Sequence, residues 1–163
     1  MIRAAYKILR VLNSDAEPGQ LSLGVAFALI AGFTPLLSLH NLLVLLLVLV
    51  LRVNLSAFLL SLAFFSGIAY ALDPLFHRIG LAVLLAPPLE SFWTARYNSA
   101  VWRLEHFNNS IVMGSLIVSL LLAVPAYLAS NWLIHKYRAH VLAWIEKTRL
   151  VHVLNVLRYG GDA

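Results

Sequence analysis

The sequence predicts an all-α integral membrane protein, and three observations support that fold class. Hydrophobic residues make up 61% of the chain and charged residues only 12%, whereas about a quarter of the residues in a soluble domain are charged. Long apolar runs follow one another, separated by short polar breaks. These breaks hold residues that start or stop helices, such as Asp73-Pro74 and Asn108-Asn109-Ser110. At this length we expect one membrane domain, residues 1–163.

Composition also limits the kinds of function. The absence of cysteine rules out a disulfide framework and a cysteine-based zinc or iron–sulfur site. In a chain this apolar, the net charge of +5 is better explained by basic residues beside cytoplasmic headgroups than by nucleic acid. We therefore expect membrane lipids as partners, and no nucleic acid, cofactor or metal. No signal peptide is evident, so the membrane segments are expected to direct insertion.

Both ends of the chain are predicted to be basic amphipathic helices in the membrane interface. In residues 1–14, Arg3, Lys7 and Arg10 form a polar stripe beside a wide apolar face, which is the pattern of an interfacial helix. Packing on the protein's own core would give the same pattern, and the two can hold together. Residues 136–158 form a similar basic tail.

Residues 15–52 are predicted to form a tight helical hairpin. A capping box at Ser14-Asp15-Ala16-Glu17, with Ser14 as the N-cap, starts the first helix, which runs to about Phe33. Thr34 is then predicted as the N-cap of the second helix, with Pro35 at its first position. The connection between the two helices would therefore have almost no loop.

The hairpin helices are short for a bilayer. The apolar part of the first, Leu21 to Phe33, is about 20 Å long, and the second, Leu36 to Leu51, is about 24 Å, against a hydrocarbon core of roughly 30 Å. A hairpin that spans twice and a re-entrant one satisfy the same topology. The turn has neither a charge nor a long loop, so we favour a re-entrant hairpin with its tip below the outer headgroups.

Two further membrane-crossing helices are predicted after the hairpin. The first covers residues 55–72 and stops at Asp73-Pro74, and the second covers residues 111–135. Residues 73–110 between them are predicted to be interfacial, with an amphipathic, aromatic-rich helix at 89–107. Lysine and arginine are concentrated at the two ends of the chain, so the positive-inside rule places both termini in the cytoplasm, and the expected location is the inner membrane of a bacterium.

Small residues recur every fourth position on three predicted helices. Such faces let helix backbones approach closely in lipid, so we expect them to pack, either within one chain or between subunits of a homo-oligomer. The three ladders are Gly24, Ala28 and Gly32; Ala63, Gly67 and Ala71; and Ser115, Ser119 and Ala123.

The predicted hairpin tip gathers polar residues. Thr34, Ser38 and Asn41 share a face after Pro35, and His40 lies on a neighbouring face. A helix N-terminus can hold an anion such as a headgroup phosphate, so the tip is a candidate contact for a headgroup or a partner. We favour the simpler interpretation, in which these residues cap the turn and a hydrogen-bonded core histidine fixes the hairpin.

Catalytic motifs are absent from the sequence. There is no HExxH, no GxSxG and no phosphate-binding glycine loop. Asp73 and His77 are spaced to pair on a helix, but a cap and an interfacial charge explain them, and Glu105 and His106 are adjacent and point apart. We therefore predict that the protein is not an enzyme.

One pattern suggests a family. The run Pro18-x-x-Leu21-x-x-Gly24-x-Ala26-x-x-x-x-x-Gly32-x-x-Pro35, followed by a leucine-rich helix ending Leu51-Arg52-Val53-Asn54, resembles the bacterial membrane family called domain of unknown function 2062. The resemblance covers roughly residues 15–80, and the length and basic ends are similar to a subgroup of small stand-alone members. Ala28 and Asp73 depart from the glycine and asparagine expected in relatives.

The resemblance implies a location more than a chemistry. Members of the small subgroup are similar to proteins of bacteria with an outer membrane, and are encoded beside a large envelope protein of the AsmA-like, lipid-bridge type. The leading hypothesis is a non-enzymatic inner-membrane partner subunit that anchors this large protein or supplies lipid to it. The alternatives are a small homo-oligomeric transporter or channel that uses the polar hairpin tip, and a lipid enzyme that depends on His40 or His77.

Overall fold

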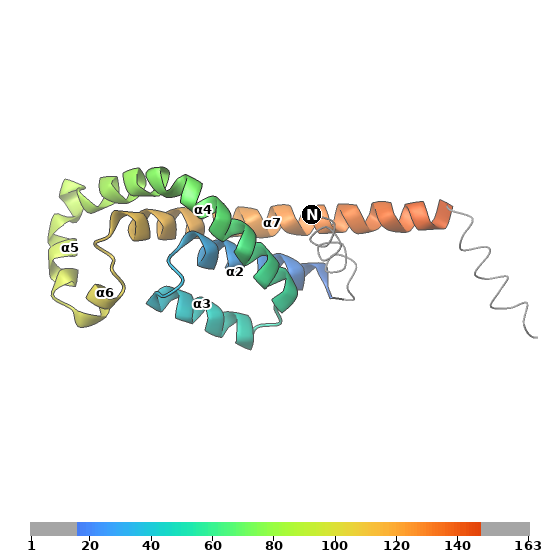
Figure 1. The fold of residues 1–163 in the computed structure, drawn as a ribbon, viewed down its shortest axis with the longest axis horizontal. Helices are drawn as coiled ribbons and strands as arrows, with labels where there is room; N and C mark the ends of the chain where they lie inside the picture. Colours follow the sequence, from blue (N-terminus) through green and yellow to red (C-terminus); the bar gives the residue numbers. More distant parts are fainter. Residues whose placement is uncertain (1–15, 148–163) are drawn as a thin grey trace, which may run out of the picture.

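The computed structural model describes residues 16–147 and, among these, the side chains of residues 16–140. Every regular element in this range is a helix (Figure 1): α2 (Pro18–Phe33), α3 (Leu39–Val50), α4 (Leu55–Leu84), the 3₁₀ helix η1 (Pro87–Leu89), α5 (Glu90–Tyr97), α6 (Ala100–Leu104) and α7 (Ser110–Lys147). The predicted all-α fold is confirmed for these residues. The predicted helix at 1–14 and the tail beyond residue 147 lie outside them.

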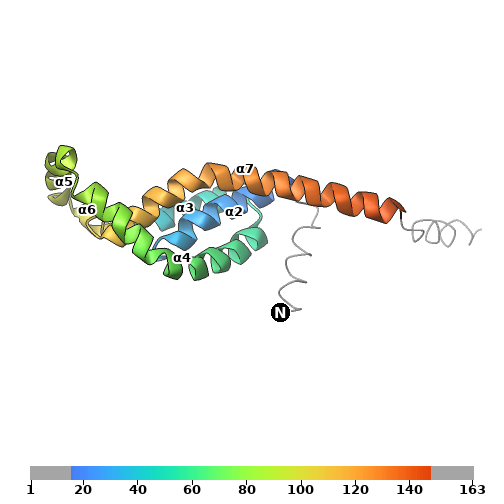
Figure 2. The same ribbon diagram turned by 90° about the horizontal axis from the view of Figure 1, so that it is seen from above.

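Helices α2, α4 and α7 form the core, and Figure 2 shows α2 running between the other two. The residues from Ala28 to Phe33 of α2 are all buried, because both sides of the helix are covered. Phe33 packs edge-on against Phe65 and tilted against Phe76, with ring centres 5.6 Å and 5.3 Å apart. Leu21, near the other end of α2, packs with Ala57 and Ile134. The core along α2 is therefore mainly apolar, and the buried hydroxyl of Ser22 donates to the Pro18 carbonyl within the helix.

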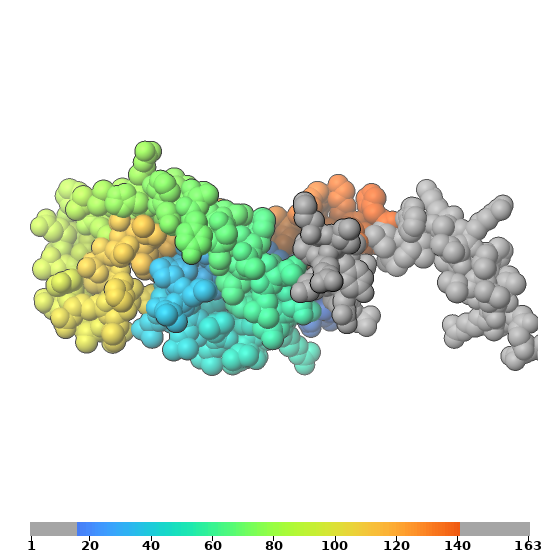
Figure 3. Space-filling model, in the orientation of Figure 1, coloured from blue at the N-terminus to red at the C-terminus, as the bar shows by residue number. Residues whose placement is uncertain are grey.

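Helix α3 lies on the outside of this core. Asn41, Val44 and Val48 are its buried residues, and their spacing of three and four puts them on one narrow stripe. Leu47 is half-buried, and the other leucine and valine side chains of α3 are exposed: Leu39, Leu42, Leu43, Leu45, Leu46, Leu49 and Val50. The space-filling view shows α3 beside the first part of α4 on one face of the molecule (Figure 3).

Helix α4 runs without a break through Pro74, so the predicted end at residue 72 and the N-cap role of Asp73 are wrong. A proline inside a helix costs about 3 kcal/mol. Here the helix is held on both sides of it, by Phe65 and by Phe76, which both pack on Phe33. This packing offsets the cost of Pro74, so the helix continues to Leu84.

Two other predicted boundaries differ. The predicted capping box began at Ser14, outside the described residues, but α2 has Glu17 as its N-cap, because a residue before proline is held in the extended region. The last helix was predicted to end at His135. It continues as α7 to Lys147, since the sequence from 136 to 147 holds no glycine or proline to stop it.

The segment between α4 and α7 folds back toward the hairpin. Figure 1 places α5 and α6 at one end of the molecule, away from the end toward which α7 extends. The single helix predicted at 89–107 is broken into α5 and α6, because Ser99 is extended and starts α6. The break lets the aromatic rings cluster: Trp93 stacks on Phe107, and Trp102 meets Phe92 and Phe107 edge-on.

Candidate functional site at the hairpin tip

The hairpin tip is a five-residue turn, Thr34 to Ser38, and not the direct helix restart that the sequence predicted. Thr34 is extended and follows α2 as its C-cap, while Ser38 precedes α3 as its N-cap. Thr34 is therefore not the N-cap of the second helix, and Pro35 is not its first residue. Pro35 holds Thr34 in the extended region, so α2 ends there. The residues up to Ser38 then reverse the direction of the chain before α3 begins.

The polar atoms of Thr34 and Asn41 are used inside the protein. Asn41 Nδ2 donates to the Pro35 carbonyl at 2.9 Å and to the Ala31 carbonyl at 3.3 Å. The Thr34 hydroxyl lies 2.8 Å from the Ile30 carbonyl oxygen and 3.2 Å from Asn41 Oδ1. Thr34 and Asn41 are 4% and 1% exposed, so this pair closes the turn and offers nothing to a ligand.

His40 joins the tip to the segment that folds over it. Its Nδ1 pairs with Glu105 Oε1, and its backbone N–H donates to Glu105 Oε2 at 3.3 Å. The other ring nitrogen, Nε2, lies 3.0 Å from the Ser38 hydroxyl. The His40 and Glu105 side chains are 13% and 15% exposed. Residues 65 positions apart in the chain are thus linked by a largely desolvated pair.

Sequence reasoning considered Glu105 only as a partner of its neighbour His106 and missed its contact with His40. His106 has a positive φ of 54° and lies in the turn at residues 105–108, which begins with Glu105 and follows α6. The available signal was a lone carboxylate between aromatic residues of a predicted interfacial helix.

An apolar groove lies beside the His40–Glu105 pair, between α3 and α6. Its volume is about 590 Å³, and its walls are lined by Leu39, His40, Leu42, Leu43, Leu46, Val101, Trp102, Glu105 and Leu116. The pair therefore places one carboxylate and one imidazole at the edge of an otherwise apolar surface. Such a site suits a ligand with an apolar body and a polar end.

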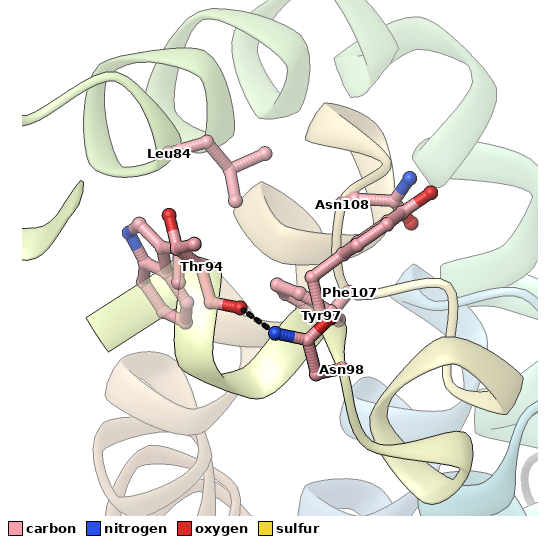
Figure 4. Close-up of a pocket in the computed structure, with 7 residues that line it drawn as sticks. Leu84, Thr94, Tyr97, Asn98, Phe107 and Asn108 are labelled. Atoms are coloured by element: carbon pink, nitrogen blue, oxygen red, sulfur yellow. Dashed lines mark hydrogen bonds between the residues drawn. The ribbon is translucent and has the colours of Figure 1, made fainter. Parts of the chain in front are cut away.

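A smaller pocket of about 340 Å³ lies where α4 meets α5 (Figure 4). Tyr97, Asn98 and Asn108 line it, and Trp93 closes one side, with its indole N–H donating to the Val83 carbonyl at 3.1 Å. Asn98 donates to the Thr94 carbonyl at 3.4 Å, the contact dashed in Figure 4. Aromatic and amide side chains together are typical of a membrane–water interface.

Two of the three small-residue ladders are packed against other helices of the same chain. A Cβ on Gly24 would stand 3.0 Å from the Phe58 backbone nitrogen, and one on Gly32 would stand 2.8 Å from Phe65 Cβ, so the ladder with Ala28 lets α2 press against α4. Ser115 and Ser119 are fully buried, and Ala123 packs against the core. The third ladder, Ala63, Gly67 and Ala71, is exposed on the outer face of α4.

The closest approach of two helices involves residues that the ladders did not include. A Cβ on Gly80 would overlap the Ser110 carbonyl, and a Cβ on Gly114 would overlap the Phe76 carbonyl. The backbones of α4 and α7 therefore touch at these two glycines.

The structure also places His77, the remaining histidine candidate from the sequence. His77 Nδ1 lies 2.6 Å from the Ser110 hydroxyl and not against Asp73. Within the described residues, no three histidine or carboxylate side chains gather to hold a metal ion.

Comparison with known proteins decides the family. The model of an uncharacterised protein family conserved in bacteria, DUF2062, matches residues 2–142. The chain belongs to the DUF2062 family. This confirms the resemblance and extends it beyond residues 15–80. The DUF2062 chain is also similar to an uncharacterised protein of Treponema pallidum (strain Nichols), with 28% identity over 141 residues, covering 86% of this chain and 87% of the relative. No solved structure matches it.

Proposed function

We propose that the protein is a non-enzymatic inner-membrane subunit of an envelope complex, which anchors a large AsmA-like periplasm-spanning protein or supplies lipid to it. The observation that carries this proposal is the apolar surface of α3, which continues into the groove under α6. The large partner is inferred from the resemblance to small stand-alone family members. A surface of this kind meets acyl chains or the apolar face of another membrane protein.

The proposal places α4 and α7 across the membrane. Both are long and apolar enough for this, whereas α2 and α3, with 16 and 12 residues, are about 24 Å and 18 Å long. The tip also carries Leu37, which is 100% exposed and would be unfavourable in water. These features support a re-entrant hairpin whose tip stays within the bilayer.

Charge supports the orientation. Arg52 follows α3, and the last part of α7 carries Lys136 and Arg138, which supports a cytoplasmic location for this end of the molecule. Residues 87–109 then lie at the periplasmic surface, above the hairpin tip, where a periplasm-spanning partner would dock.

Purification of the full chain in a mild non-ionic detergent tests the proposal. A large membrane-anchored envelope protein should be recovered in a stoichiometric amount. Recovery of a lone, stable monomer from cells that express the AsmA-like protein would contradict it. The variant Glu90→Gln changes an exposed side chain outside the groove. It serves as a control for losses during purification.

A small homo-oligomeric transporter or channel is the second candidate. It is favoured by a cavity of about 570 Å³ on the other side of the tip, lined by Thr34, Tyr70 and Asp73 among others. Liposomes containing only this chain would then show solute flux that falls with Asp73→Asn. The internal bonds of Thr34 and Asn41 weigh against this function.

A further inference from the structure

We propose that the groove between α3 and α6 binds one acyl chain of a phospholipid whose headgroup carries a primary ammonium, as in phosphatidylethanolamine, with that ammonium at Glu105. The inference rests on the proposed membrane location and names the lipid class that the site would take.

The walls of the groove select an acyl chain. Leu39, Leu42, Leu43 and Leu46 lie on one side, and their helix rises about 10 Å from the first to the last. Val101 and Trp102 form the other side, and Leu116 of α7 is a further lining residue. The volume of about 590 Å³ is within the roughly 300–1,000 Å³ of ligand pockets. Since this face of α3 is not covered by the core, lipid reaches the groove directly.

The edge of the groove selects the headgroup. Within the described residues, Glu105 has His40 as its ion-pair partner, and the groove is lined by no lysine or arginine. Glu105 is the one acidic side chain among the lining residues, and it lies in a largely desolvated position. An ammonium brings both the opposite charge and N–H donors, and such charge-assisted bonds are strong. A phosphatidylglycerol headgroup carries no positive charge and would be repelled.

The position of Glu105 next to α6 explains how the acyl chain and the headgroup of one lipid are recognised together. Glu105 directly follows α6, the helix that supplies Val101 and Trp102. The carboxylate and the apolar wall are therefore fixed to each other by one short turn of chain. A lipid that fills the groove has its headgroup on the periplasmic side, beside this turn.

Native mass spectrometry of the purified full chain with added lipids tests the inference. The probes are phosphatidylethanolamine and phosphatidylglycerol with identical acyl chains. We expect at least about a fivefold preference for phosphatidylethanolamine, which corresponds to about 1 kcal/mol. Equal binding of the two lipids would overturn the inference, whereas failure to recover a large partner would affect the proposed function alone.

Matched variants separate the headgroup from the acyl chain. Glu105→Gln should abolish the preference, and His40→Gln, which keeps the carboxylate and removes the competing imidazole, should retain it. Leu46→Trp should lower the binding of both lipids at least fivefold, while Leu49→Trp, on the same helix outside the groove, should not. Retention of the preference in Glu105→Gln, or equal losses in the two tryptophan variants, would overturn the inference.

Discussion

At the scale of single residues, the molecule depends most on Gly80 and Gly114. Each lies where the other helix's backbone occupies the space of a side chain. Gly67 also lies inside the long apolar helix α4, but a Cβ there would meet nothing within 4 Å. The three glycines therefore provide a comparison in which the same substitution has opposite consequences.

We predict that Gly114→Ala lowers the stability of the chain by about 1–3 kcal/mol, because the helices must separate to admit the methyl group. Gly67→Ala should leave stability unchanged or raise it, since alanine is favoured over glycine in a helix by about 1 kcal/mol. Thermal unfolding of the two variants in the same detergent measures the difference. Equal melting temperatures would show that the backbones do not touch.

Asn41 is the second critical residue, because its amide serves two carbonyl groups of the turn. We predict that Asn41→Leu destabilises the protein by about 1–3 kcal/mol, the cost of leaving buried polar groups without a partner. Asn98→Leu is the control, since Asn98 is exposed and makes one bond of 3.4 Å. Urea or thermal unfolding in detergent compares them, and a similar loss in both variants would contradict the role of the tip amide.

At the scale of elements, the α2–α3 hairpin is the unusual part of the fold. It is shorter than the helices beside it, and His40 ties its tip to residues that fold over it. The phenylalanine contacts place the end of α2 beside Phe65 and Phe76 of α4. Helix α4 continues from Phe76 to Leu84, which is about 12 Å further. The hairpin tip is therefore below the end of α4.

We predict that a cysteine at Ser38 reacts at least tenfold more slowly with a membrane-impermeant thiol reagent than a cysteine at Ser91. The chain has no cysteine of its own, so each single variant reports one position. Ser91 is exposed on α5 and serves as the periplasmic control, and Arg52→Cys serves as the cytoplasmic one. Labelling of Ser38→Cys in intact cells as fast as Ser91→Cys would indicate a hairpin that spans the bilayer.

At the scale of the whole molecule, orientation is the property to test. In the proposed orientation, with α4 and α7 crossing in opposite directions, residue 98 would lie in the periplasm and residue 163 in the cytoplasm. We predict that alkaline phosphatase fused after Asn98 is active and that the same enzyme fused after Ala163 is inactive, because its disulfides form only in the periplasm. Green fluorescent protein at the same positions should give the opposite result. Activity at both positions would contradict the crossing of the membrane by both helices.

Much of this architecture follows from the sequence because apolar length and small-residue spacing are local signals. The all-α fold, two long apolar helices and the close packing of Gly24 and Gly32 could be predicted in this way. The prolines were harder. Pro18 is the first residue of α2, four residues after the predicted N-cap Ser14, while Pro35 lies in a turn and Pro74 lies inside α4. Helix α4 continues through Pro74 because Phe76 packs in the core, and this contact is seen only once the helices are assembled.

The candidate site could be predicted in part. The polar residues at 34–41 were identified, and capping of the turn with a hydrogen-bonded histidine was favoured over a face open to a ligand. In the structure, Thr34 and Asn41 turn inward, and His40 pairs with Glu105. Contacts between residues 65 positions apart depend on the path of the chain after α4, which local patterns do not encode. For the same reason the sequence did not show the groove.

The place of α7 in the core has a consequence for biosynthesis. Leu21 is covered by Ile134, which leaves the ribosome 113 residues later, about 6 to 23 s at the usual 5–20 residues per second. During that interval α3 and α4 can pack on α2, but its α7 side stays uncovered. In the proposed membrane location, we therefore expect the nascent chain to need protection from premature association, and so to depend on the insertion machinery, until α7 enters the membrane.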